Sequence, residues 1–551
     1  MILVQIFFFI IFSSVSILSI AGLGQLINTN KKNEFINNFF FGLIVLSFLI
    51  TLLHFFVKIS LIVTIFILIS GLLIISKNFL TNKIKLNDDY ILYFIIFLIL
   101  IPLYISQKYH EDFGYYHLPY VINVINEKII FGLANINNAF VHNSLWLNIL
   151  PFFYIEDNFN LIMTPTFLIY IMFIIFSVHQ IIKRQDQKIS SFFLTVATFY
   201  LILKFTRLSE FGNDIPSMIF SSLAIYYFFR FLEEIDFKKK KDYFFKNLSF
   251  SLFAILIKFS SIPVVILTIY LFFKNYKFLI KEIFHYNYII IYILCIMFFA
   301  QQFIYTGCFI FPSNLSCFDV SWFDQNFLNS KHKLELINKS YFVTARDILT
   351  EKEYLNDFNW VSYWFKKNFI EISEHLGTMI IPVLIYIFFL KKENNQNLIN
   401  YKKLSFFYFF VLVSFVFWLE FSPVYRFGIT YFISIVFLLG YFFYVKKIFS
   451  RKVFFNLIFI FLFFNLAKNL ERLSNENDIF VGIKKIKNLS IPNTYYGKNT
   501  IQIFQPDLAS NAKKGNGWQG RLCWDIDFIC TKNKVAIKKI NSYLFVKKIE
   551  N

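Results

Sequence analysis

Long apolar runs separated by short polar segments dominate the chain. A helix needs about 20 predominantly apolar residues to cross the roughly 30 Å hydrocarbon core of a bilayer. Runs that reach or approach this length lie at 1–25, 37–57, 59–76, 90–106, 161–182, 190–204, 215–232, 286–306, 376–390, 405–421, 428–445 and 453–466. The first run lacks a basic start and a small-residue cleavage site, so we expect a retained helix rather than a signal peptide. The pattern predicts an all-α, polytopic transmembrane helical bundle.

One further apolar stretch, residues 244–273, is longer than a single span. It is interrupted in its middle by Lys258, Ser260, Ser261 and Pro263. The stretch is therefore either one long helix or two short ones.

The distribution of Lys and Arg separates the two sides of the membrane. Cytoplasmic loops carry an excess of these residues. If residues 107–160 lie outside and residues 244–273 cross twice, the inner segments hold 24 Lys and Arg and the short outer turns hold 4. The inner segments are then 26–36, 77–89, 183–189, 233–247, 274–285, 391–404 and 446–452. This asymmetry predicts about fourteen spans, with Lys258 at an outer turn.

The composition agrees with a membrane protein. Hydrophobic residues make up 57% of the chain and charged residues 16%, whereas soluble domains carry about 25% charged residues. The net charge of +20 would suggest nucleic acid as a partner of a soluble protein. Here the basic loops face the anionic lipids of the inner leaflet instead. We expect membrane lipids as partners and no nucleic acid.

Three polar segments are too long to be simple turns. They are residues 107–160, residues 307–375 and the tail 467–551, and all three fall on the outer side in this layout. We therefore expect a transmembrane region over 1–466, a small extracytoplasmic tail over 467–551, and the function on the outer face.

The cysteines give separate evidence on sidedness. Cys308 and Cys317 lie close together in the second long segment, and Cys523 and Cys530 lie close together in the tail. Two close pairs in outer segments indicate disulfides in an oxidising compartment. Unpaired thiols are the alternative.

The densest ionisable cluster begins the first long segment. It contains His110, Glu111, Asp112 and His117 among four tyrosines. Adjacent carboxylates at a membrane surface are costly unless they bind a cation or move a proton. A helix over 118–130 should follow and lie along the interface. The alternative is a solvated loop start with tyrosines at the membrane boundary.

A second polar turn carries Arg207, Glu210 and Asp214 between two spans. Glu210 or Asp214 would complete a site with Glu111 and Asp112, because all of them emerge on the same face. A turn that only caps the next helix is the alternative.

Two single cations, Lys258 and Arg426, lie near the outer boundary. A cation at this depth needs a partner, and a lipid-linked phosphate is the natural anion there. Alternatively, Lys258 extends toward the surface and Arg426 pairs with Glu420.

Together these features resemble the GT-C superfamily of multi-pass glycosyltransferases that use polyprenyl-phosphate sugars. The resemblance lies in the acidic first outer segment, the amphipathic stretch after it, the acidic turn two spans later and the interrupted span Leu-Ile-Lys-Phe-Ser-Ser-Ile-Pro. The run His-Glu-Asp-Phe-Gly-Tyr-Tyr-His-Leu-Pro-Tyr also looks like a motif of a poorly characterised bacterial branch of these proteins. The likeness covers mainly residues 90–310.

The resemblance implies roles for the candidate residues. Asp112 and Glu111 would activate the acceptor hydroxyl or hold Mg²⁺ or Mn²⁺, with His110 and His117 beside them. Glu210 or Asp214 would be the second acidic position. The donor phosphate would be bound by Lys258, Arg426 or Arg207.

The function implied is sugar transfer from a polyprenyl-phosphate donor to a glycan or lipid acceptor of the cell envelope, on the outer face of a bacterial inner membrane. A single displacement at the anomeric carbon would invert its configuration. The Trp-Trp-Asp motif of oligosaccharyltransferases and a large C-terminal domain are missing from the sequence, which argues against oligosaccharide transfer to protein.

Two other functions remain open. The first is a flippase or transporter of lipid-linked glycans, although no internal repeat is visible. The second is a polysaccharide polymerase or ligase, whose active loop would lie in the 307–375 segment with Arg346, His332 and His375.

Overall fold

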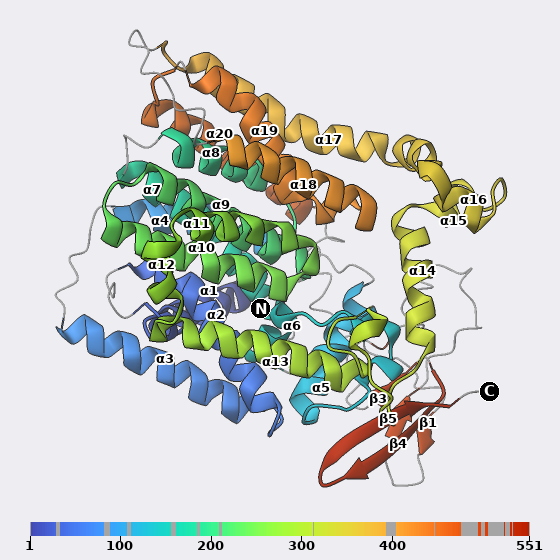
Figure 1. Cartoon of the computed structure of the whole chain (residues 1–551). Coiled ribbons are helices and arrows are strands. Elements are labelled where there is room, and N and C mark those ends of the chain that lie inside the picture. Colours follow the sequence, from blue (N-terminus) through green and yellow to red (C-terminus); the bar gives the residue numbers. More distant parts are fainter. Residues whose placement is uncertain are drawn as a thin grey trace.

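The structure is a bundle of long helices that lie side by side (Figure 1). The computed structural model describes residues 2–28, 34–81, 89–106, 112–155, 161–183, 188–208, 212–311, 313–392, 404–445, 447–474, 494–496, 502–504, 523, 529–531 and 533–549. The long helices are α1 (Ile2–Gly24), α2 (Phe35–His54), α3 (Leu61–Thr81), α4 (Asp89–Ile105), α7 (Thr164–Lys183), α8 (Lys188–Lys204), α9 (Asp214–Glu233), α10 (Phe237–Ile257), α11 (Val265–Lys274), α13 (Ile289–Thr306), α17 (Trp360–Phe389), α18 (Ser405–Phe421), α19 (Ile429–Tyr444) and α20 (Arg451–Ser474).

Shorter elements connect these helices. The short α-helices are α5 (Leu118–Asn126), α6 (Leu145–Ile149), α12 (Tyr276–Ile283), α14 (Asn326–Asn338), α15 (Tyr341–Thr344) and α16 (Glu351–Leu355). Single turns of other helix types include η1 (Phe113–His117), η2 (Leu133–Asn135), η3 (Asn138–Val141), η4 (Leu150–Phe153), η6 (Phe259–Val264), η7 (Tyr286–Tyr288), η8 (Asn314–Ser316), η9 (Asn356–Phe358) and η11 (Tyr425–Phe427). The strands are β1 (Thr494–Tyr496), β2 (Gln502–Phe504), β3 (Ile529–Cys530), β4 (Val535–Ile540) and β5 (Tyr543–Lys548).

The helices identify a multi-pass membrane protein. Within the described residues, seven helices are long and apolar enough to cross a bilayer, namely α1, α2, α7, α9, α13, α17 and α20. A bent pair, in which α12 turns by 116° from η6 and α11, is a further candidate. Five shorter apolar helices lie among them: α3, α4, α8, α18 and α19.

One end of the bundle, here called the loop end, carries the long connecting segments. The backbone N–H of Gly132 donates to the carbonyl of Ile304 at the end of α13, at 2.8 Å. The Ser144 hydroxyl donates to the carbonyl of Ile257 at the end of α10, also at 2.8 Å. The segments between α4 and α7 and between α13 and α17 therefore meet at the same end of the bundle.

Contacts at the opposite end of the bundle join segments that the count of Lys and Arg assigned to the inner side of the membrane. The Lys246 ammonium lies 2.7 Å from the Glu34 carboxylate, and the backbone N–H of Ile448 donates to the carbonyl of Lys391. Stretch 244–273 is split between α10 and α11, as the two-helix alternative requires.

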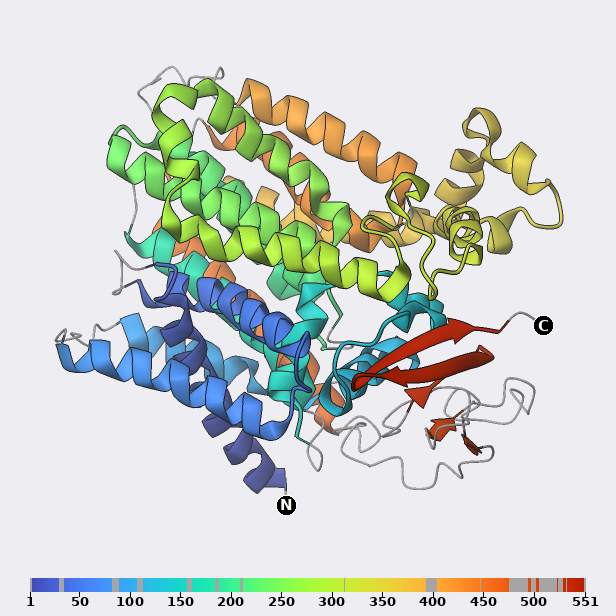
Figure 2. The ribbon, with the colours of Figure 1, turned by 60° about the horizontal axis from the view of Figure 1, so that its bottom comes forward.

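The C-terminal strands make the tail more structured than an all-α prediction allows. Strands β4 and β5 form an antiparallel hairpin, which lies beside the loop end (Figure 2). The backbone of Phe131 pairs with Leu544 and Val546 of β5 at 2.9 and 2.8 Å, and its ring stacks on Phe545 at 4.4 Å. All three long polar segments thus contact one another, because Trp322 also packs against Phe131.

Two predicted boundaries were wrong for local physical reasons. Helix α5 ends at Asn126 and most of its side chains are buried in protein, so it does not lie along the interface up to residue 130. Helix α20 continues to Ser474, past 466. There Asn469 and Arg472 form hydrogen bonds to other parts of the protein, and this pairing stabilises the extra turns.

Replacing Gly132 with Ala should loosen the hairpin. Gly132 has φ +73, and a Cβ there would lie 2.2 Å from the carbonyl oxygen of Val546. We expect a cost of about 1–3 kcal/mol and faster hydrogen exchange in β4 and β5. The control is Gly377→Ala, where a Cβ would meet nothing within 4 Å. Unchanged hydrogen exchange in β4 and β5 of Gly132→Ala would show that the hairpin does not pack against the segment around Gly132.

Candidate functional site

Three charged side chains meet at the loop end. The Lys258 ammonium forms an ion pair with the Asp214 carboxylate, and the Nε atom of Arg426 lies 3.6 Å from the same carboxylate. Asp214 and Lys258 are largely buried, whereas Arg426 keeps 47% of its side chain exposed. The structure therefore brings together three predicted site residues from distant parts of the chain.

Interruptions in the helices place these groups. Asp214 is the first residue of α9. Lys258 adopts an extended conformation (φ −155, ψ 121) between α10 and η6, and Arg426 lies in η11 between α18 and α19. The Lys258 ammonium also lies 3.5 Å from the ring centroid of Phe427, a cation–π contact.

The alternatives that the sequence left open can now be separated. The Lys258 side chain is only 14% exposed and is paired, so it does not extend to the surface. Arg426 pairs with Asp214, whereas Glu420 lies 3.9 Å from the ammonium of Lys339. Asp214 contacts both cations, so it does more than cap a helix.

Hydroxyl groups complete a small polar pocket around the cluster. Besides the charged residues and Phe427, its lining comprises Ser217, Met218, Ser260, Ser261, Ile429, Thr430 and Tyr431. The Ser217 and Ser261 hydroxyls are 2.6 Å apart, and the Tyr431 hydroxyl donates to the carbonyl of Ser260. Two cations, one carboxylate and several hydroxyl donors form a site suited to a small anion such as phosphate.

His142 is a neighbour that the sequence did not single out. It lies two residues before Ser144, whose hydroxyl binds the end of α10. The residue as a whole is exposed, but the imidazole is surrounded by neighbouring atoms. This burial and then the charge of Lys258 lower the pKa of His142 to about 4. The imidazole is therefore neutral at pH 7. No motif marks this histidine, because its relation to Lys258 exists only in the folded chain.

Asp112 of the first long segment is not among the residues that line this pocket. Asp112 precedes η1 and is partly buried. Burial and then the Asp112 charge raise the pKa of Tyr115. His117 is buried at the end of η1, with its ring 4.1 Å from that of Tyr116. The predicted partners His110 and Glu111 lie outside the described residues.

Arg207 links the start of the first long segment to the connection between α8 and α9. Its Nε donates to the carbonyl of Ser106, at the end of α4, at 3.2 Å. Arg207 therefore lies at the point where the first long segment begins, while Asp214 follows it on the same connection between α8 and α9. Glu210, between them, lies outside the described residues.

Both cysteine pairs are joined. The Sγ atoms of Cys308 and Cys317 are bonded, as are those of Cys523 and Cys530. The first disulfide lies directly after α13 and the second adjoins β3. Cys295, within α13, is a free thiol.

The described residues contain no group of three or more His, Cys, Asp and Glu side chains that could hold a metal ion. Of the predicted metal pair, only Asp112 is described.

A buried network of neutral groups holds the first long segment against the bundle. The Asn148 amide donates to Thr51 at 2.9 Å and to the Gln301 side chain at 3.0 Å. Gln301 donates to Tyr305 at 2.7 Å, and the Tyr305 and Tyr120 hydroxyls are 3.0 Å apart. Satisfied buried networks of this kind fix one arrangement of the elements that they join.

Removing Lys258 should destabilise the protein through Asp214. The variant Lys258→Met leaves a buried carboxylate with only the longer Arg426 contact, at a cost of about 3 kcal/mol. The double variant Lys258→Met/Asp214→Asn should recover part of this loss, as measured by thermal unfolding in detergent. The control is Lys274→Met, on the exposed end of α11. Equal losses in the single and double variants would contradict the pairing.

The pKa of His142 should depend on Lys258. Diethyl pyrocarbonate modifies only the neutral imidazole, so the rate at His142, followed by mass spectrometry, should reach half its maximum near pH 4. In Lys258→Gln the midpoint should rise only in part, because a positive neighbour is removed while the burial of the imidazole remains. An unchanged midpoint would show that Lys258 does not act on His142.

Comparison with known proteins gives one match. A family model described as a domain of unknown function, DUF8201, matches residues 1–433. No curated protein and no solved structure gives a significant match. The matched region contains α1 to α18, the ion cluster and the first disulfide. Because it spans most of the chain, the protein belongs to the DUF8201 family.

Proposed function

We propose that this protein is an integral membrane glycosyltransferase of GT-C type. It would move a sugar from a polyprenyl-phosphate donor to a glycan or lipid acceptor of the cell envelope. The pocket formed by Asp214, Lys258 and Arg426 would bind the donor phosphate.

The convergence of two cations on one carboxylate supports this proposal most directly. Lys258 and Arg426 come from separate helix interruptions and share Asp214. A charged group at membrane depth is costly unless it is paired. Asp214 keeps the two cations together before the donor binds. The donor phosphate would enter the pocket from the side of Arg426, because this side chain is about half exposed.

In the proposed reaction, a carboxylate of the first long segment removes the proton from the acceptor hydroxyl. Asp112 is the described candidate for this general base. The hydroxyl oxygen attacks the anomeric carbon while the bond to the donor phosphate breaks. Lys258 and Arg426 stabilise the negative charge that develops on the departing lipid phosphate. A single displacement of this kind inverts the anomeric configuration.

We further propose that fourteen helical segments cross the membrane and that the loop end is extracytoplasmic. The segments would be the fourteen long helices named above, with η6 and α11 forming one of them. The basic turns at the opposite end support a cytoplasmic location for that end, and the two disulfides support an oxidising compartment at the loop end. In a bacterium the protein would then lie in the inner membrane, with a periplasmic site.

Sugar transfer by purified protein in proteoliposomes tests the proposal. With labelled polyprenyl-phosphate sugar, Asp112→Asn should lower the transfer rate by about 10²–10⁴-fold because the base is lost. Arg426→Ala should lower it by about 10²–10³-fold because charge on the leaving phosphate is no longer stabilised. The matched control, Lys352→Ala, removes an exposed cation in α16 and should leave the rate unchanged.

Two outcomes would contradict the proposal. Full transfer by both site variants would remove the residues from the chemistry. Movement of the labelled lipid across the bilayer without sugar transfer would instead identify a transporter.

A further inference from the structure

A short disulfide-closed loop follows α13 at the loop end. Helix α13 ends at Thr306, and the next residue, Gly307, has a φ of +84 that turns the chain. The Cys308–Cys317 disulfide then closes the loop. Residues 307–318 contain no charged side chain, which is unusual for a polar segment of a membrane protein.

The loop satisfies many of its own backbone polar groups. The N–H of Phe309 donates to the carbonyl of Ser316, and the N–H of Phe318 donates to that of Gly307, both at 3.0 Å. The Ser316 hydroxyl accepts from the N–H of Ile310 and contacts the Ile310 carbonyl at 2.8 Å. Backbone groups that leave water need such internal partners, because each unpaired group costs several kcal/mol in hydrocarbon. This loop is therefore suited to an apolar environment.

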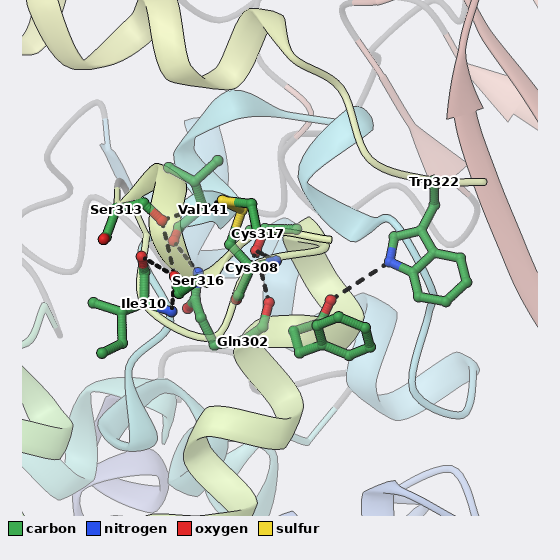
Figure 3. Close-up of a disulfide and its surroundings, with 10 residues drawn as sticks. Val141, Gln302, Cys308, Ile310, Ser313, Ser316, Cys317 and Trp322 are labelled. Atoms are coloured by element: carbon green, nitrogen blue, oxygen red, sulfur yellow. Dashed lines mark hydrogen bonds between the residues drawn. A yellow bond between two sulfur atoms is a disulfide. The ribbon is translucent and has the colours of Figure 1, made fainter. Parts of the chain in front are cut away.

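Four of its large apolar side chains are exposed. Leu315 is 100% exposed, and Phe309, Ile310 and Phe318 are 40–53% exposed. Figure 3 shows Ile310 pointing away from the disulfide, and the Gln302 amide donates to the carbonyl of Val141 at 2.9 Å.

The exposed apolar surface is continuous with the outward face of α13. Ile289, Ile293 and Ile296 are exposed on this candidate membrane span. Their spacing places Phe303 on the same face. The Phe303 ring stacks on Phe309 at 4.9 Å and contacts Phe318 at 5.8 Å, so the apolar face extends from the span into the loop.

We propose that loop 307–318 is a rigid membrane anchor that inserts into the acyl-chain region of the leaflet at the loop end. The disulfide and the internal hydrogen bonds hold the loop in shape, so insertion orders few additional groups. This inference does not depend on the proposed enzymatic activity.

The anchor also sets the position of the segment that carries His142. Phe311, on the protein side of the loop, is buried with Ala134 and Val141, and its ring lies 6.1 Å from that of His142. The segment that carries Val141 and His142 continues to Ser144, whose hydroxyl donates to the end of α10 beside Lys258. Insertion would thereby hold this face of the site at a constant depth in the membrane.

Tryptophan fluorescence in nanodiscs tests the insertion. The variants Leu315→Trp and Ile310→Trp each add one indole to the loop, and two variants guard against a failure of either to fold. Lipids brominated on their acyl chains should remove most of the fluorescence added relative to wild type, and aqueous acrylamide should remove little. The control is Lys538→Trp on the exposed face of β4, where the opposite pattern is expected.

Two results would contradict the proposal that loop 307–318 inserts into the membrane. Strong quenching by acrylamide without quenching by brominated lipid would place the loop in water. Protection from both quenchers would show that protein covers it, with a second copy of the chain as the first candidate. Sugar transfer is not measured in this experiment, so its outcome is separate from that of the proposed function.

Discussion

The cost of placing charge at membrane depth constrains the loop end of this protein. Lys258 and Asp214 are both largely buried, and each would be strongly unfavourable alone. Their pairing, with Arg426 beside them, joins the start of α9, the end of α10 and the turn between α18 and α19. The ion cluster therefore links three helical connections and also creates the pocket that is the best candidate for the site.

Neutral polar groups organise the surrounding structure in a different way. The amides of Asn148 and Gln301 and the hydroxyls of Tyr120 and Tyr305 satisfy one another without any charge. This network connects the first long segment to α2 and α13. The C-terminal hairpin then covers that segment through Phe131. The buried network and the tail thus both hold the first long segment in place.

The candidate site residues differ in whether a sequence pattern could identify them. Asp214, Lys258 and Arg426 were each identifiable as charges near a membrane boundary, and the structure joins them. Asp112 and His117 were identified by their dense motif, but the structure leaves them outside the pocket lining. His142 carries no sequence signal, because its low pKa depends first on burial in the folded chain and then on Lys258, a residue distant in the chain.

The sequence by itself determined the membrane-protein class, the interruption at Lys258 and the two cysteine pairs. These properties depend on local quantities: the length of apolar runs, the sign of nearby charge and short separations along the chain. Only the tertiary structure decided which charges meet, because Lys258 lies 44 residues from Asp214 and Arg426 comes from a third segment. It also decided that the tail folds back as a hairpin on Phe131. Backbone pairing between segments so far apart depends on how the helices bring them together. No local pattern in the sequence indicates which distant segments will meet.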